Sequence, residues 1–141
     1  MKRFLWCAVL AAAVFLAGCG LAMNADYAER LDRQAMLAEV QHQKAEAGDL
    51  EPADMAAVLK ASAAEWKAFQ QARGPWFGLS PVWMNTEYTQ RVDKTVAWTA
   101  DMVRRTEAGN LDEAQLKRVL AADSKLWRLF NEARVAPEED E

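Results

Sequence analysis

Glu39 and His42 come closest, by residue type and spacing, to a metal site in this chain. Di-iron helical bundles take ligands from a Glu-x-x-His pair on each of two helices. The chain has one histidine, and the repeat described below places Ala100 and Val103 at the equivalent positions. A symmetric dimer could supply the missing half of such a site. We favour the alternative, in which His42 is a partly buried core histidine with a hydrogen-bond partner.

Asp123 is the second residue with chemical potential, because it interrupts an otherwise apolar helical stripe between Leu120 and Trp127. A carboxylate buried at that point needs a cation or several hydrogen-bond donors. One hypothesis makes Asp123 a ligand anchor, and His42 could serve the same purpose. The other makes it an ordinary salt-bridge residue or places it at the rim of the core, and we favour this second hypothesis.

The beginning of the chain carries the most specific motif. Lys2 and Arg3 precede an uncharged apolar stretch, Phe4 to Ala17, whose end overlaps the motif Leu16-Ala17-Gly18-Cys19. This arrangement resembles the signal peptide and lipobox of bacterial lipoproteins, and the resemblance covers residues 1–20. The apolar stretch has fourteen residues, whereas a membrane-spanning helix needs roughly 20.

The resemblance implies that residues 1–18 are removed and that Cys19 becomes a lipidated N-terminus at the cell envelope. An uncleaved membrane anchor is the alternative. Gly20, rather than aspartate, follows the cysteine. In the lipoprotein family this implies transport onward to the outer membrane, if the organism has one.

The composition of the mature chain restricts its chemistry. Cleavage removes Cys7, Lys2 and Arg3, so residues 19–141 hold 15 basic and 21 acidic residues, a net charge of −6. Four of the acids form a tail at residues 138–141. Nucleic acid binding needs a basic surplus, so we expect no nucleic acid partner. With Cys19 lipidated, no thiol remains, and the chain has no glycine-rich phosphate loop. We therefore expect no cofactor and no enzymatic activity.

An internal duplication defines the architecture. Residues 23–73 match residues 84–134 at an offset of 61, with 17 of 51 positions identical and no gap. Each copy has the pattern of two amphipathic helices joined by a tight turn. The first helices are predicted from about Asp26 to Glu46 and from about Glu87 to Glu107. The sequence therefore predicts an all-α protein with four helices, arranged as two duplicated hairpins and most simply packed as one four-helix bundle.

Particular residues mark the ends of these helices. Asn24 and Asn85 suit N-caps, whereas Gly48 and Gly109 suit the left-handed conformation that ends a helix. Asp112 with Gln115 resembles a capping box, and Pro52 suits a first helical turn.

The two repeats also share a polar motif in their first helices. Tyr27-x-x-Arg30 with Asp32 recurs as Tyr88-x-x-Arg91 with Asp93. A repeated binding site would give the same pattern. We favour a shared structural role, in which these residues pin the end of each first helix to a partner.

The segment between the copies, residues 74–83, does not have the composition of a solvated linker. It contains two glycines and two prolines, which exclude a continuous helix, together with Trp76, Phe77 and Trp83. These aromatic residues either fold back and close one end of the bundle or form an exposed patch that contacts a partner protein or the membrane interface.

Together these features predict three segments: a signal peptide at residues 1–18, a helical domain at residues 19–137 and an acidic tail at residues 138–141. We expect a lipid-anchored envelope protein that acts as an interaction module or accessory subunit for another envelope protein. The alternative is a small helical-bundle carrier of an apolar or haem-like ligand.

Overall fold

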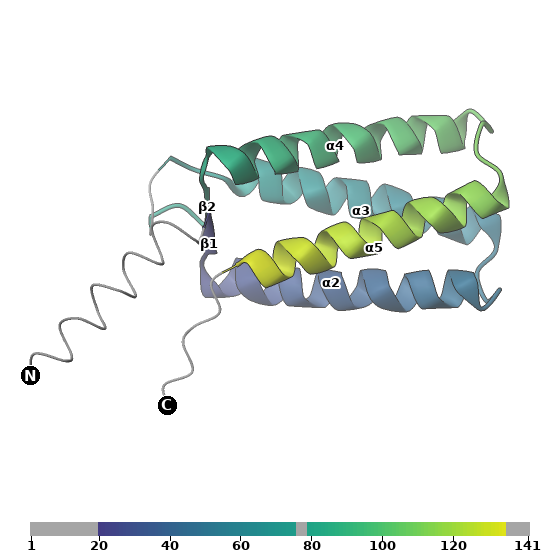
Figure 1. Cartoon of the computed structure of the whole chain (residues 1–141), viewed down its shortest axis with the longest axis horizontal. Helices are drawn as coiled ribbons and strands as arrows, with labels where there is room; N and C mark the ends of the chain where they lie inside the picture. Colours follow the sequence, from purple (N-terminus) through teal and green to yellow (C-terminus); the bar gives the residue numbers. More distant parts are fainter. Residues whose placement is uncertain (1–19, 76–78, 135–141) are drawn as a thin grey trace, which may run out of the picture.

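The computed structural model describes residues 20–75 and 79–134 of the chain. Four antiparallel helices form a bundle, and a two-stranded sheet lies at one end of it (Figure 1). The helices are α2 (Ala25–Glu46), α3 (Pro52–Ala72), α4 (Thr86–Glu107) and α5 (Glu113–Ala133), and the strands are β1 (Leu21–Met23) and β2 (Val82–Met84). The predicted all-α bundle is thus confirmed, and both first helices begin within one residue of their predicted starts.

The N-terminal ends of the helices follow the predicted capping residues. The side chain of Asn24 accepts a hydrogen bond from the backbone N–H of Tyr27 at 2.9 Å, and Asn85 does the same for Tyr88 at 2.9 Å. Asp112 caps α5 through a complete capping box, and Pro52 opens α3. These caps satisfy backbone N–H groups that have no acceptor within the helix.

The C-terminal ends of α2 and α4 are closed by glycine. Gly48 has φ of 79° and Gly109 has φ of 73°, in the left-handed region that other residues enter only at a cost. Beyond Gly48, the Asp49 N–H donates to the carbonyl of Lys44 at 2.8 Å, which completes a Schellman motif. Both glycines belong to hairpin turns, and these turns lie at the end of the bundle opposite the sheet (Figure 1).

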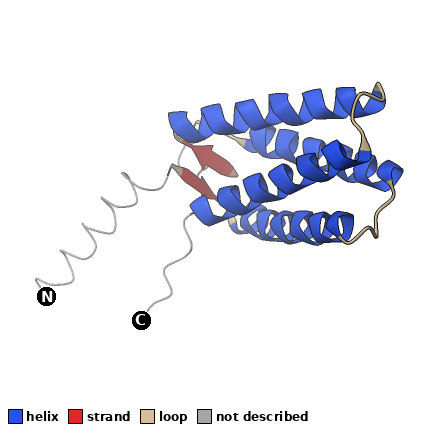
Figure 2. Ribbon diagram, turned by 45° about the vertical axis from the view of Figure 1, so that its right-hand side comes forward, coloured by secondary structure: helices blue, strands red, loops and turns tan. Residues whose placement is uncertain are grey.

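The small sheet was not predicted, because three-residue strands are too short to show a period of two. β1 and β2 pair antiparallel (Figure 2), with Leu21 opposite Met84, Ala22 opposite Trp83 and Met23 opposite Val82. This register is symmetric about its central pair, since each strand occupies the same place in its repeat. The structural repeat therefore begins at residues 21 and 82, two residues before the sequence identity becomes visible.

The two hairpins interlock rather than packing as separate units. α2 packs mainly against α5, and α3 packs mainly against α4, whereas the two helices within each hairpin touch each other little. α3 and α5 also meet across the centre of the bundle (Figure 1). Most of the stabilising contact is therefore made between the repeats.

Apolar side chains form a core in two parts, one at each end of the bundle. The cluster nearer the sheet consists of Leu21, Leu31, Ala38, Trp66, Phe69, Val82, Met84, Val92, Trp127 and Phe130. The cluster nearer the hairpin turns consists of Ala45, Met55, Leu59, Leu116, Val119 and Leu120. The polar residues Ser62 and Asp123 are buried between them.

The duplicated aspartates join the repeats through ion pairs, whereas the sequence predicted only a shared structural role at the end of each first helix. Asp32 on α2 lies 2.5 Å from the guanidinium of Arg134, and Asp93 on α4 lies 3.2 Å from that of Arg73. Each pair links the first helix of one repeat to the C-terminal end of the second helix of the other. These contacts support the structural role of the aspartates.

The duplicated arginines differ between the repeats. Arg30 makes two hydrogen bonds to Glu65, at 2.6 and 2.9 Å, which raise its pKa. Leu126 takes the place of Glu65 in the second repeat, so Arg91 pairs instead with Glu87 on its own helix at 2.6 Å.

Candidate functional site

Ser62 and Asp123 form the polar centre of the bundle. They lie halfway along α3 and α5, and the Ser62 hydroxyl donates a hydrogen bond to the Asp123 carboxyl at 2.5 Å. Both side chains are buried, and Asp123 is only 2 % exposed. The residues are separated by 61 positions in the sequence, the offset of the duplication, so equivalent positions of the two repeats meet here.

Two tryptophans complete this centre. Trp66 Nε1 donates to the Asp123 carboxyl at 3.0 Å, and Trp127 Nε1 donates to Ser62 Oγ at 2.9 Å. The two indole rings are stacked, with centroids 3.7 Å apart and an interplanar angle of 16°. Each indole thus donates to the polar residue of the other repeat, and every donor of the group has an acceptor.

Burial raises the pKa of Asp123, while the hydrogen bonds from Ser62 and Trp66 act in the opposite direction. The predicted rim position and salt bridge are wrong: Asp123 is deep in the core, and it makes no ion pair with any residue in the described part of the chain. Instead, the need for hydrogen-bond donors is met by neutral groups.

Glu39 and His42 have separate surroundings. Glu39 accepts hydrogen bonds from Ser124 at 2.9 Å and from Gln43 at 3.0 Å, which lower its pKa. His42 is half-buried, and its Nδ1 has no hydrogen-bond partner among residues 20–75 and 79–134. The hydrogen-bond partner predicted for His42 is therefore not found at this nitrogen. The adjacent buried positions on α2, Ala38 and Ala45, carry no polar group that could supply it.

The usual ligand sets of metal ions bring several side chains together. Within the described ranges, no three His, Asp or Glu side chains lie together in a way that could hold a metal ion.

A groove of about 300 Å³ lies between α2 and α3, the two helices of the first hairpin, which touch each other little. Its lining is mainly apolar, and Ser62 and Asp123 form part of it. Gln41 also lines this groove, and its side-chain oxygen is buried without a hydrogen-bond partner in the described residues. The groove therefore connects the surface of the first repeat with the polar centre.

A second groove of about 340 Å³ lies between α4 and α5 and has a different character. Arg91 and Lys94 border an apolar lining that includes Trp66 and Phe130. This groove lies nearer the sheet end of its hairpin than the first groove does, so the two hairpins differ in both the position and the chemistry of their gaps.

The outer face of α2 carries three large apolar side chains close to the first groove. Met36 is 70 % exposed, Leu37 is 51 % exposed and Val40 is 41 % exposed, and Leu37 also lines the groove. We call these three residues the α2 face. Sequence reasoning missed them, although they are apolar residues that lie outside the buried positions of α2, which are Leu31, Ala38 and Ala45.

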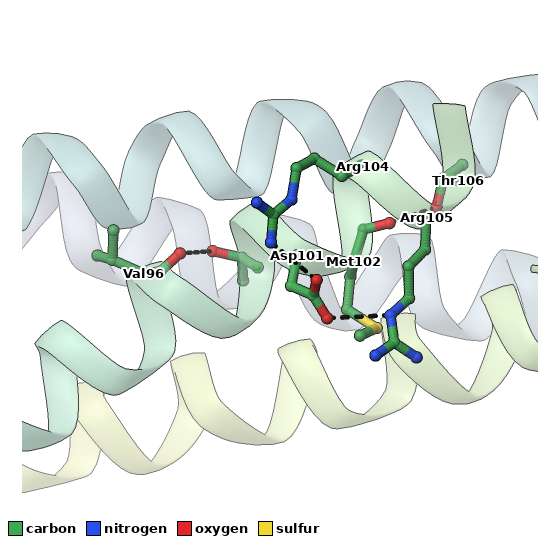
Figure 3. A network of polar contacts seen from close by, with 7 residues as sticks. Val96, Asp101, Met102, Arg104, Arg105 and Thr106 are labelled. Atoms are coloured by element: carbon green, nitrogen blue, oxygen red, sulfur yellow. Dashed lines mark hydrogen bonds and ion pairs between the residues drawn. The ribbon is translucent and has the colours of Figure 1, made fainter. Parts of the chain in front are cut away.

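The second repeat has no such surface at the equivalent positions. Ala97 replaces Met36, and Trp98, in the place of Leu37, is partly buried against the core cluster nearer the turns. Asp101 replaces Val40; it accepts a hydrogen bond from Arg104 at 2.8 Å and forms an ion pair with Arg105 at 3.0 Å (Figure 3).

The predicted linker contacts are only partly visible. Trp83 is half-buried within β2, opposite Ala22, while Trp76 and Phe77 lie outside the described residues, as does Cys19. Leu79, in the same segment, is 84 % exposed.

Comparison with known proteins identifies no relative. No family model matches the chain, and neither curated proteins nor solved structures give a significant match. Helices long and apolar enough to cross a membrane do not occur among residues 20–75 and 79–134.

Proposed function

We propose that this protein is a lipid-anchored, non-enzymatic interaction module of the cell envelope, which binds a partner protein through the α2 face. The lipid on Cys19 would hold it at the membrane, at the outer membrane where one exists. The observation that carries the proposal is the exposure of Met36, Leu37 and Val40 beside the groove.

The second repeat provides an internal control for this argument. The fold places Met36 and Ala97 at equivalent positions, and Val40 and Asp101 likewise. Because Ala97 and Asp101 are compatible with the same helix and packing, the fold does not need large apolar residues there. Exposed apolar side chains that the fold does not need favour an interaction surface.

The groove supplies depth to this surface. Interface energy is concentrated in a few apolar anchors that fill pockets on the partner. The groove beside Leu37, walled by Ala57, Val58 and Ala61 of α3, can accept such anchors. An amphipathic helix presents a row of apolar side chains along one face, and such a row can lie in a groove between two helices. A partner with an exposed apolar helix face therefore fits best.

The proposal is tested by capture of partners from detergent-solubilised native membranes. The bait carries Met36→Glu with Leu37→Glu, and the matched control is Ala97→Glu, which places a charge at the equivalent position of the second repeat. A partner recovered by the wild type and the control but lost from the double variant supports the α2 face. Equal recovery by all three baits contradicts it. The melting temperatures should agree within a few degrees, because these side chains are exposed.

The aromatic residues Trp76, Phe77 and Trp83 remain a second proposed contact. Trp76→Ala with Phe77→Ala is expected to weaken binding to the partner or to membranes without lowering the melting temperature. A large loss of stability would indicate that these rings close the end of the bundle instead.

A ligand carrier is the second candidate function, because Asp123 and Ser62 line the groove. The volume of about 300 Å³ is at the lower end for a ligand pocket, which favours a small apolar molecule with one hydrogen-bond donor over haem. His42 does not line either groove described above. Native mass spectrometry of the protein purified from membranes tests this: a bound mass lost in Asp123→Asn would support a carrier.

A further inference from the structure

Gly20 is held tightly against the start of α4. The residue is buried, and its carbonyl accepts a hydrogen bond from the Asn85 N–H at 2.7 Å. A Cβ at this position would lie 2.3 Å from Asn85 Nδ2 and 2.4 Å from Tyr88 Cδ2. Leu21, the next residue, is completely buried in the core. The path of the chain is therefore fixed from residue 20 onward.

Cys19 is joined directly to Gly20 by one peptide bond, so their Cα atoms are about 3.8 Å apart. A lipid on Cys19 would enter the bilayer without any spacer between it and the packed bundle. We infer that the bundle rests directly on the membrane surface with its sheet end, which we define as β1, β2 and the exposed residues Pro75, Leu79 and Pro81. This inference rests on the lipidation of Cys19 included in the proposed function.

The chemistry of the sheet end suits a lipid surface. Leu79 is its most exposed apolar residue, and the flanking Pro75 and Pro81 are exposed as well. The carboxylates of Asp32 and Asp93 near this end are neutralised by ion pairs with Arg134 and Arg73. The pairing of these two carboxylates and the exposed apolar side chains reduce the repulsion and the desolvation that oppose contact with anionic headgroups. Among the acids that the structure describes at this end, the exposed Asp26 in the first turn of α2 keeps an unpaired charge.

This orientation sets the height of the α2 face. A helix of 22 residues is about 33 Å long, so the turns at Gly48 and Gly109 project that far from the membrane. Met36, near the middle of α2, lies about half as high and faces sideways from the standing bundle. The proposed partner would therefore be met close to the same membrane surface.

Site-directed spin labelling tests the inference on the full lipidated protein. With Cys19 lipidated the mature chain has no free thiol, so Leu79→Cys, Met36→Cys and Asn110→Cys each give a single labelled site. The proteins are reconstituted in vesicles of phosphatidylethanolamine and phosphatidylglycerol. Accessibility to oxygen, which concentrates in lipid, is compared with accessibility to a water-soluble nickel complex.

We expect the label at Leu79 to show high oxygen and low nickel accessibility, and the labels at positions 36 and 110 to be open to nickel. Equal exposure of all three labels to nickel would overturn the inference. A variant with a flexible Gly-Ser spacer of about ten residues after Cys19 keeps the lipid but frees the bundle. It is expected to lose the contact at Leu79, and retention of that contact would show that the direct junction is not responsible.

Mass spectrometry of the N-terminal peptide separates this inference from its premise. A lipidated Cys19 with a water-exposed Leu79 label contradicts the standing orientation alone. An unmodified Cys19 contradicts the lipid anchor, and the orientation with it.

Discussion

Ser62 donates a 2.5 Å hydrogen bond to Asp123 although the two residues occupy the same position in the two repeats. The stacked Trp66 and Trp127 are related in the same way. The centre of the bundle is therefore a pseudo-twofold axis at which residues meet their own counterparts. Two aspartates there would place like charges together in the core, which strongly disfavours ionisation of both. One serine and one aspartate give all three donors of the group an acceptor.

This symmetry makes a prediction about exchanging the two residues. Asp123→Ser should lower the unfolding free energy by about 1–3 kcal/mol, because it removes an acceptor from buried donors. Ser62→Asp should be at least as harmful, because it buries a second carboxyl beside the first. The double variant Ser62→Asp with Asp123→Ser rebuilds the group with the repeats exchanged and should recover most of the loss.

Urea unfolding of the four proteins at one pH measures the coupling between the two sites. Additive losses in the double variant would show that the two positions are not interchangeable and would contradict the symmetric description of the centre.

The raised pKa of Asp123 predicts a pH dependence of stability. Between the ordinary aspartate pKa of about 4 and its higher value in the folded protein, the native state retains a proton that the unfolded state releases. The contribution of Asp123 to stability is therefore complete below the ordinary value and declines as the pH rises through the folded value.

Asp123→Asn isolates this effect from the opposite trends of Glu39 and Asp93, whose pKa values are lowered. The stability of the wild type relative to this variant should fall as the pH is raised from about 4 through the higher pKa of Asp123 in the folded protein. Parallel curves for the two proteins would mean that the carboxyl titrates normally.

The ends of the helices were predictable because they depend on local chemistry. Asn24, Asn85, Gly48 and Gly109 act on backbone groups within a few residues of themselves, so their roles can be recognised without tertiary structure. The pairing of α2 with α5 was not predictable, since an apolar stripe shows which face of a helix is buried but not what covers it. The alignment placed Ser62 and Asp123 at one position, but only the interlocked packing brings them together.

The turn glycines give a simpler prediction. Gly48→Ala and Gly109→Ala should each lower the unfolding free energy by about 1 kcal/mol, because alanine is disfavoured at positive φ. Beyond the neighbouring residues, no atom lies within 4 Å of the added Cβ at either position, so clashes with other parts of the fold do not contribute. Similar decreases in the melting temperature of both variants are expected, and an unchanged melting temperature would contradict the conformational argument.

The interlocked packing predicts that neither repeat folds alone as a monomer. A fragment of residues 20–75 contains α2 and α3, which hardly touch each other, and lacks the helices that cover them. Each fragment should show little helix by circular dichroism at low concentration, where self-association is suppressed. Mixing the fragment of residues 20–75 with the fragment of residues 79–134 should restore helicity at one-to-one stoichiometry. Cooperative unfolding of a single monomeric fragment would contradict the interlocked arrangement.

The unusual residues of the α2 face could have been noticed by aligning the two repeats, but their exposure to solvent could not be predicted from the alignment. The alignment sets Met36, Leu37 and Val40 against Ala97, Trp98 and Asp101, a change from large apolar to small or charged residues at two of three positions. Whether these side chains are covered depends on the splay of α2 from α3, which is set by packing between the repeats.

Photo-crosslinking in living cells tests the central claim, binding through the α2 face, most directly. A photoreactive phenylalanine analogue is placed at Met36 or, as the matched control, at Ala97. One discrete adduct with another envelope protein from position 36, absent from position 97, is the predicted result. No adduct at position 36, or the same adducts at both positions, would contradict the account.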